Sequence, residues 1–181
     1  MARLFRPAPP RSPRANLLWT GAQSLVVWGL ALAVVPVLLV AVERRVGVPA
    51  FDFSGRWGVA LALFVGCSAL NTASGAVLAV RGRGTPLPVA CPRALVIAGP
   101  YRYVRNPMAV AGIGQGVAVA LGLGSWLVLG YALAGAVLWH AAIRPAEERD
   151  LAARFGRAYV AYRNAVPLWR PRGRAYRDPD A

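Results

Sequence analysis

Three long stretches without a charged residue divide the chain, and they run over residues 17–42, 57–80 and 108–143. The first holds 26 residues, enough for about 39 Å of helix, and the second is of similar length, so each can cross a hydrocarbon core of about 30 Å. The third holds 36 residues and is interrupted at 122–125 by Gly-Leu-Gly-Ser, which indicates a turn between two helices. The pattern predicts an all-α, polytopic membrane protein with about four transmembrane helices, the last two forming a tight hairpin.

The third predicted span is short. From residue 108 to 121 it covers about 21 Å at helical rise, so it must thin the bilayer locally or begin deep in the protein. Small residues recur along it every four positions, at Gly112, Gly116, Ala120 and Gly124. Such a stripe favours close packing between helices. Direct contact with a cofactor is the alternative interpretation.

An amphipathic helix is predicted beyond the last span, over about 145–165. Apolar and aromatic residues recur on one of its faces, at Leu151, Phe155, Tyr159 and Tyr162. Glu147 shares the face of Leu151, so at least one of the two neighbouring carboxylates, Glu147 and Glu148, should point inward. Asp150 and Arg154, four residues apart, are expected to form an exposed ion pair.

The distribution of charge along the chain predicts the orientation of the bundle in the membrane. The formal net charge is +14 although hydrophobic residues make up 57% of the chain, so basic and apolar residues must be segregated. All 21 basic residues are arginine. Eighteen of them lie in the N-terminal arm, the loop between spans two and three, and the C-terminal tail, and three lie on the opposite side. This bias predicts that both termini and the loop face the cytoplasm. We expect an integral protein of a bacterial inner membrane.

The predicted organisation has four parts. They are a basic, proline-rich arm over 1–16, a transmembrane domain over 17–143 whose loop 81–107 is cytoplasmic, the amphipathic helix over 144–168, and a basic tail over 169–181. The prolines of the arm disfavour a regular helix there, and we expect it to lie against anionic headgroups. The first apolar run is far longer than the core of a signal peptide, so we interpret it as an uncleaved anchor.

Cysteine and histidine are too few to support a metal site. Cys67 falls inside the second span and Cys91 in the cytoplasmic loop, which implies neither a disulfide nor metal ligation. The lone histidine, His140, lies near the end of the fourth span, where an interfacial role is favoured over a catalytic one. We expect the lipid bilayer as a partner and no nucleic acid, and the sequence leaves the oligomeric state open.

Residues 99–108 read Gly-Pro-Tyr-Arg-Tyr-Val-Arg-Asn-Pro-Met and concentrate polar and aromatic groups at the start of the hairpin. We call this stretch the cassette. Pro107 restricts Asn106 to an extended backbone and suits the first position of the third span, whose N-terminus favours an anion. Arg105 could add a bidentate contact to that anion. The alternative is that Arg102 and Arg105 only anchor the loop among headgroups.

Glu147 and Glu148 follow the other end of the hairpin, so short connections bring them to the cassette. They could simply pair with Arg144 or Arg102. An inward carboxylate, an arginine at a helix N-terminus and several tyrosines nevertheless match what S-adenosylmethionine requires. Its ammonium group needs a carboxylate, its carboxylate needs arginine, and its sulfonium favours aromatic faces.

These motifs, together with Gly82-Arg83-Gly84-Thr85-Pro86, Phe155-Gly156 and Val166-Pro167, resemble the isoprenylcysteine carboxyl methyltransferase and phospholipid methyltransferase family of integral membrane enzymes. The resemblance covers roughly the C-terminal half and implies S-adenosylmethionine as cofactor. It places Arg105, Asn106 and Pro107 on one side of the pocket and Glu147 and Glu148 on the other. The wall residues it implies, with less specific motifs, are Tyr101, Tyr159 and Tyr162, and the catalytic roles fall to Arg105 and Glu147.

The chain departs from the family pattern in two places. Asn106 stands where the family often has histidine, and Ala109, Val110 and Ala111 precede Gly112 where the family has an aromatic residue and an earlier glycine. These departures bear on the methyl acceptor more than on the cofactor.

The sequence leaves the acceptor open among a carboxylate, a thiol and an amine. In-line methyl transfer depends mainly on alignment. A carboxylate or thiolate needs no general base, whereas an amine would need Glu147 or Glu148. A lipidic or small hydrophobic acceptor arriving between spans is favoured. The rival interpretations are a membrane enzyme resembling sterol reductases, which would bind NADPH, and a non-enzymatic membrane scaffold.

Overall fold

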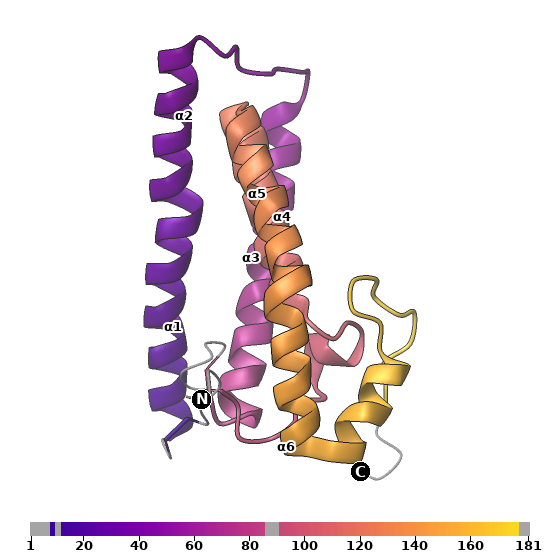
Figure 1. Ribbon diagram of the computed structural model, residues 1–181. Helices are drawn as coiled ribbons and strands as arrows, with labels where there is room; N and C mark the ends of the chain where they lie inside the picture. The colour runs from indigo at the N-terminus through magenta and orange to yellow at the C-terminus, as the bar shows by residue number, and fades with distance from the viewer. Residues whose placement is uncertain (1–7, 10–11, 86–90, 178–181) are drawn as a thin grey trace.

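The computed structural model describes residues 8–9, 12–85 and 91–177, and its architecture is all-α, as predicted (Figure 1). Four helical rods stand roughly side by side. In chain order they comprise α1 (Pro13–Gly29), η1 (Leu30–Val34) and α2 (Val35–Val46) as one continuous rod, then α3 (Arg56–Arg81), then α4 (Pro107–Leu123), and last α5 (Trp126–Leu138), η4 (Trp139–Ile143) and α6 (Arg144–Ala165).

Three of these rods are long and apolar enough to cross a membrane, namely those over 13–46, 56–81 and 126–165. The uncharged part of the last rod ends at Ile143, so α6 lies beyond the span. The rod formed by α4 has 17 residues, about 26 Å at helical rise. It is shorter than the others, as the sequence predicted, and the chain is an integral membrane protein.

The first rod begins four residues earlier than the predicted span. Helix α1 starts at Pro13, inside the stretch expected to be an irregular arm, and the Ser12 hydroxyl caps it by accepting the Ala15 amide at 3.2 Å. A proline is tolerated there because the first-turn amides of a helix have no carbonyl partner. The rest of the arm, at 1–7 and 10–11, lies outside the described residues. A π turn at η1 precedes Pro36 and keeps the rod continuous.

The predicted amphipathic helix is not a separate element. A second π turn, η4, carries the fourth span through Pro145 into α6, because widening one turn accommodates the missing proline amide. The break comes later, at Gly156, whose φ of 52° and ψ of −128° are not helical. The final part of α6 therefore turns away from the bundle in Figure 1, and α6 ends at Ala165, where the apolar pattern predicted the helix to end.

Small residues let the spans approach closely, as the glycine stripe predicted. A Cβ atom at Gly112 would overlap the Trp28 ring, and one at Gly116 would lie 3.0 Å from the Ala132 Cβ. Gly124 closes α4 in the left-handed conformation, with φ of 65°. None of these glycines lines the cavity described below, so the stripe serves packing rather than ligand contact.

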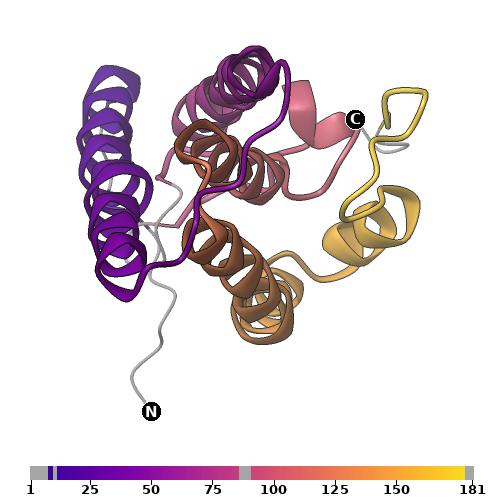
Figure 2. The ribbon, with the colours of Figure 1, turned by 90° about the horizontal axis from the view of Figure 1, so that it is seen from above.

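The tail folds back over the cassette and joins it through backbone hydrogen bonds. The Arg105 amide donates to the Pro167 carbonyl at 3.0 Å, and the Tyr176 amide donates to the Arg102 carbonyl at 2.9 Å. Tyr159, Tyr162, Val166 and Tyr176 form a buried cluster between tail and α6, with Leu151 and Phe155 packed against it. The predicted apolar face of α6 is therefore buried against the tail, although α6 bends at Gly156. Figure 2 shows this unit beside the ring of spans.

Candidate active site

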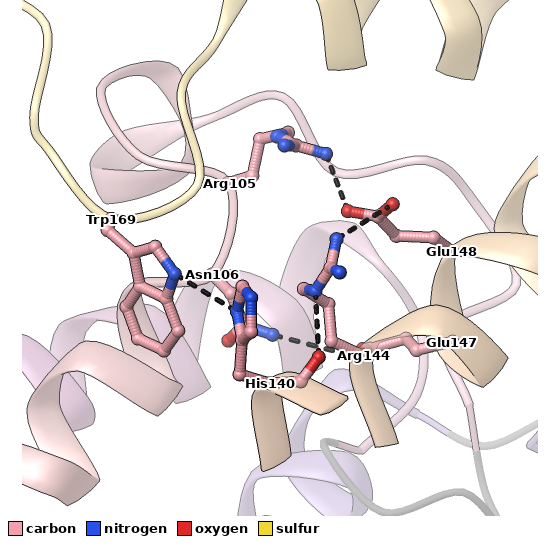
Figure 3. A network of polar contacts seen from close by, with 7 residues as sticks. All are labelled: Arg105, Asn106, His140, Arg144, Glu147, Glu148 and Trp169. Atoms are coloured by element: carbon pink, nitrogen blue, oxygen red, sulfur yellow. Dashed lines mark hydrogen bonds and ion pairs between the residues drawn. The ribbon is translucent and has the colours of Figure 1, made fainter. Parts of the chain in front are cut away.

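A cavity of about 310 Å³ opens where the cassette, η4, α6 and the tail meet. Most of its lining is apolar, and most of its charged groups come from the two sequence motifs, the cassette and the start of α6. Figure 3 shows how these groups converge: Arg105 and Asn106 extend from the loop and the start of α4, and Glu147 and Glu148 extend from α6. The predicted juxtaposition of the two hairpin ends is present.

Arg105 is held by contacts on several sides. Its Nη1 lies 2.7 Å from the Glu148 Oε1, and both side chains are largely buried, at 15% and 17% exposure. The other carboxylate oxygen of Glu148 lies 3.4 Å from Arg144 Nη1. The Arg105 Nε is buried and has no hydrogen-bond partner among the described residues. One donor of this cavity-lining guanidinium is therefore left unsatisfied by the residues that the structure describes.

Asn106 links the start of α4 to Glu147. Its Oδ1 accepts the Ala109 amide at 3.1 Å and so caps the helix, while its Nδ2 donates to the Glu147 Oε2 at 3.3 Å. This capping is the local reason why the loop ends in a fixed bend before Pro107. Pro107 itself is fully buried at the first position of α4 and is not among the cavity-lining residues.

Glu147 and Glu148 differ in their partners although they are adjacent in sequence. Glu148 is paired with two arginines, whereas Glu147 forms no ion pair among the described residues. Burial, and then the negative charges of Glu148 and Asp150, raise the pKa of Glu147 to about 7, while Arg154 opposes the rise. A carboxyl group with such a pKa can hold or release a proton near neutral pH.

The three predicted tyrosines all line the cavity. Tyr162 donates its hydroxyl hydrogen to the Tyr101 carbonyl at 2.6 Å, which ties α6 to the turn η3 (Gly99–Arg102). Burial raises the pKa of Tyr101 and of Tyr162. Burial also raises the pKa of Tyr159 to about 12; the negative charge of Glu148 adds to this rise and the positive charge of Arg105 opposes it. All three therefore stay neutral at physiological pH and offer aromatic faces and hydroxyl groups.

Two expected contacts turn out differently. Asp150 and Arg154 do pair, at 2.7 Å, but the pair is largely buried rather than exposed, because Arg154 also donates to the Pro92 carbonyl at 2.7 Å and lines the cavity. Arg102 meets neither glutamate; its Nε donates to the Tyr176 carbonyl at 2.8 Å.

Two further sequence expectations concern His140 and metal binding. His140 Nδ1 accepts from Trp169 at 3.3 Å, and the residue does not line the cavity. Within the described ranges, no three His, Cys, Asp or Glu side chains are placed to hold a metal ion.

The first rod contributes a wall of the cavity that the sequence did not predict. Gln23, Ser24, Val27 and Trp28 of α1 line the cavity, and Leu168 of the tail does so as well. The available signal was weak: Gln23 and Ser24 are adjacent polar residues within an uncharged run that otherwise indicated only a membrane anchor. Which helix faces the cavity depends on the packing of α1 against α3, and hydropathy does not determine that.

Comparison with known families decides among the chemistries that such a cavity could support. The family model for phospholipid methyltransferases matches residues 56–158, more than half of the chain. The chain belongs to this family. It is therefore a membrane methyltransferase, and the match contains the cassette together with Glu147 and Glu148. The α1 wall, Tyr159, Tyr162 and the tail lie outside the matched region of this methyltransferase. Comparisons with curated proteins and with solved structures give no significant match.

Proposed function

We propose that the protein transfers a methyl group from S-adenosylmethionine to a lipidic or small hydrophobic acceptor at the cytoplasmic side of the bilayer, with both termini in the cytoplasm. Family membership supports the reaction class. The observation that carries the choice of cofactor is the pairing pattern around the cavity, where Glu147 lacks an ionic partner and Arg105 keeps one nitrogen unpartnered.

These two groups fit the amino-acid part of the cofactor. Its ammonium group would bind Glu147, the carboxylate without an ion pair among the described residues. Its carboxylate would bind Arg105, whose Nε is buried and has no partner among the described residues, so a charge-assisted hydrogen bond there is strong. Tyr101, Tyr159 and Tyr162 supply the aromatic walls that suit an adenine ring and a sulfonium cation. Asn106 would orient Glu147 through its amide.

The acceptor side of the cavity is apolar. Val27 and Trp28 come from α1, and Trp139 and Ile143 come from η4, at the end of the last span. Figure 1 shows the α1–α2 rod standing to one side of the rod formed by α5 and α6. An acceptor with a hydrocarbon chain could therefore place its reactive group in the cavity while its chain stays among the spans. This arrangement favours a lipidic acceptor over a polar cytosolic one.

The bound cofactor would supply an electrophilic methyl group, and the protein would supply alignment, desolvation and proton handling. The apolar walls exclude water from the reacting groups. Arg105 and Glu147 would fix the cofactor's position, and a fixed position can account for much of the rate. An amine or thiol acceptor would release a proton that a carboxylate acceptor does not carry, and Glu147 and Glu148 are the cavity-lining carboxylates that could take it.

Calorimetric titration of the detergent-solubilised protein with S-adenosylhomocysteine and with NADPH tests the proposal. We expect binding of the first ligand and not of the second. NADPH binding would instead support a reductase, and a folded protein that binds neither would support a scaffold. Glu147→Gln should weaken S-adenosylhomocysteine binding by about tenfold or more, because a hydrogen bond to a charged group contributes about 1.5 to 3 kcal/mol.

Asp150→Asn is the control for that variant, since Asp150 is a nearby carboxylate that does not line the cavity. Loss of its charge favours the ionised form of Glu147, so the affinity of this control should not fall. Equal affinity in Glu147→Gln and the unmodified protein would remove Glu147 from the proposed site.

A further inference from the structure

Four consecutive tail residues connect the candidate active site to the edge of the membrane. Pro167 accepts the Arg105 amide through its carbonyl, and Leu168 lines the cavity. Trp169 packs on the end of the last span, and Arg170 is exposed. We call residues 168–174 the tail tip. A contact that holds or releases the tail tip therefore affects the Pro167 carbonyl, which accepts the Arg105 amide and lies three residues before Arg170.

Contacts of Trp169 fix the depth of the tail tip. Its ring centroid lies 5.5 Å from that of Trp139 in an edge-on contact, and its Nε1 donates to the His140 Nδ1 at 3.3 Å (Figure 3). Trp139 and His140 both belong to η4, the last turn of the uncharged run before Arg144. The tail tip therefore lies at the boundary between hydrocarbon and water, where tryptophan is favoured.

The charge of the tail tip is positive and uncompensated within the described chain. Arg170 and Arg174 are exposed, and neither takes part in an ion pair among the residues that the structure describes. Arg172 instead stacks on Tyr176, with its guanidinium carbon 5.8 Å from the ring centroid, and its amide donates to the Tyr103 carbonyl. The tip thus presents two free guanidinium groups at headgroup depth, on a segment whose backbone is bonded to the cassette.

We propose that the tail tip binds the headgroup phosphate of an anionic phospholipid, and that this contact holds the tail against the cassette. The position at the interface, the exposed tryptophan and the two arginines favour a lipid phosphate over a soluble anion, because guanidinium groups pair with phosphate and interfacial basic residues are attracted to anionic headgroups. The second part rests on the proposed function, in that it makes anionic lipid a regulator of the site formed by Arg105 and Leu168.

The coupling follows from the shared hydrogen bonds. A tail that leaves the cassette removes the carbonyl partners of the Arg105 and Arg172 amides and takes Leu168 out of the cavity wall. Lipid that binds the attached tail more tightly than the detached tail must therefore shift the population towards the closed cavity. Ligand binding at the cavity should be tighter in anionic bilayers for the same reason.

Hydrogen exchange in lipid nanodiscs tests the lipid site directly. The amides to follow are those of Arg105, Arg172 and Tyr176, which carry the hydrogen bonds between tail and cassette. We expect slower exchange of all three in discs of phosphatidylcholine with phosphatidylglycerol than in discs of phosphatidylcholine alone. High salt should abolish the difference, because it screens exposed charges.

The Arg170→Gln/Arg174→Gln double variant should lose this lipid-dependent protection by about 30-fold, because each arginine at the headgroup surface contributes roughly fivefold. Arg44→Gln/Arg45→Gln is the matched control, since it removes two exposed arginines at the opposite end of the first rod. That control should keep the full difference between the two kinds of disc.

Equal exchange in both kinds of disc would overturn the proposal, and so would lipid-dependent protection that survives in the Arg170/Arg174 variant or at high salt. Titration of the same discs with S-adenosylhomocysteine separates this inference from the proposed function. Lipid-dependent protection without ligand binding would leave the lipid site standing and refute the cofactor. Ligand binding that is equal in both discs, with protection that differs, would refute the coupling alone.

Discussion

Glu147 makes the affinity for the proposed cofactor depend on pH, and the sign of that dependence follows from its environment. Burial raises the pKa of Glu147 to about 7 in the ligand-free protein. A bound ammonium group requires the ionised carboxylate, whose fraction rises from roughly 0.1 near pH 6 to roughly 0.9 near pH 8. S-adenosylhomocysteine should therefore bind about tenfold more tightly near pH 8 than near pH 6. The affinity should stop increasing once the pH is well above the pKa of Glu147.

Calorimetry in buffers of different ionisation enthalpy measures the accompanying proton. At a pH below 7, binding should release about one proton per ligand, because the bound cation lowers the pKa of Glu147. Glu147→Gln should remove both the proton release and the pH slope. His140→Gln is the control, since His140 lies at the same end of the last span but contacts Trp169 rather than the cavity. A slope that persists in Glu147→Gln, or that disappears in His140→Gln, would refute the reasoning.

The same pKa predicts how the ligand-free protein responds to pH. The ordinary pKa of a glutamate is 4.5 and that of Glu147 is about 7, so the folded state binds the proton more tightly than the unfolded state does. Stability from this group is fully present below the ordinary value and is lost as the pH rises to about 7. Glu147→Gln should therefore raise the melting temperature of the ligand-free protein at alkaline pH and weaken ligand binding there. A lowered melting temperature in that variant would indicate that the carboxylate is needed for folding.

Three further predictions concern the cassette, the packing of α1 and the topology. Arg105→Lys should strongly reduce methyl transfer, because lysine cannot reproduce the planar guanidinium that meets Glu148 and the proposed ligand. Arg102→Lys should have a milder effect, because lysine keeps a donor for the backbone carbonyl that Arg102 contacts. Equal turnover in the two variants would exclude a special role for Arg105. Gly112→Ala should lower the melting temperature and reduce the free energy of unfolding by about 1 to 3 kcal/mol, because the new methyl group would overlap the Trp28 ring. Gly130→Ala should have no such effect, because the space around Gly130 is open. Reporter fusions in the loop after α2 and at the chain end should report opposite compartments, and the same compartment for both would contradict the orientation inferred from the arginine bias.

Hydropathy and local signals were sufficient for the spans and their turns. The uncharged runs correspond to the rods, and Gly124 and Ser125 end α4 and cap α5 as the turn sequence predicted. These features are local, because span length follows from the bilayer thickness and a turn follows from a few backbone angles. The continuity of α5 with α6 was not predictable in the same way. Proline ordinarily marks a helix boundary, and the π turn that accommodates Pro145 leaves no signature in the sequence.

The candidate site also has features that the sequence predicts and features that it does not. The sequence alone predicts which chemical groups meet, since the hairpin must bring the cassette and the glutamates together, and it predicts that the tyrosines of α6 face inward. Three features emerge only from the packed fold: arginine neutralises Glu148 but not Glu147, α1 supplies a wall, and the tail backbone holds Arg105. Periodicity encodes which face of a helix avoids water, whereas pairing and desolvation depend on distances of a few ångströms between elements far apart in the chain.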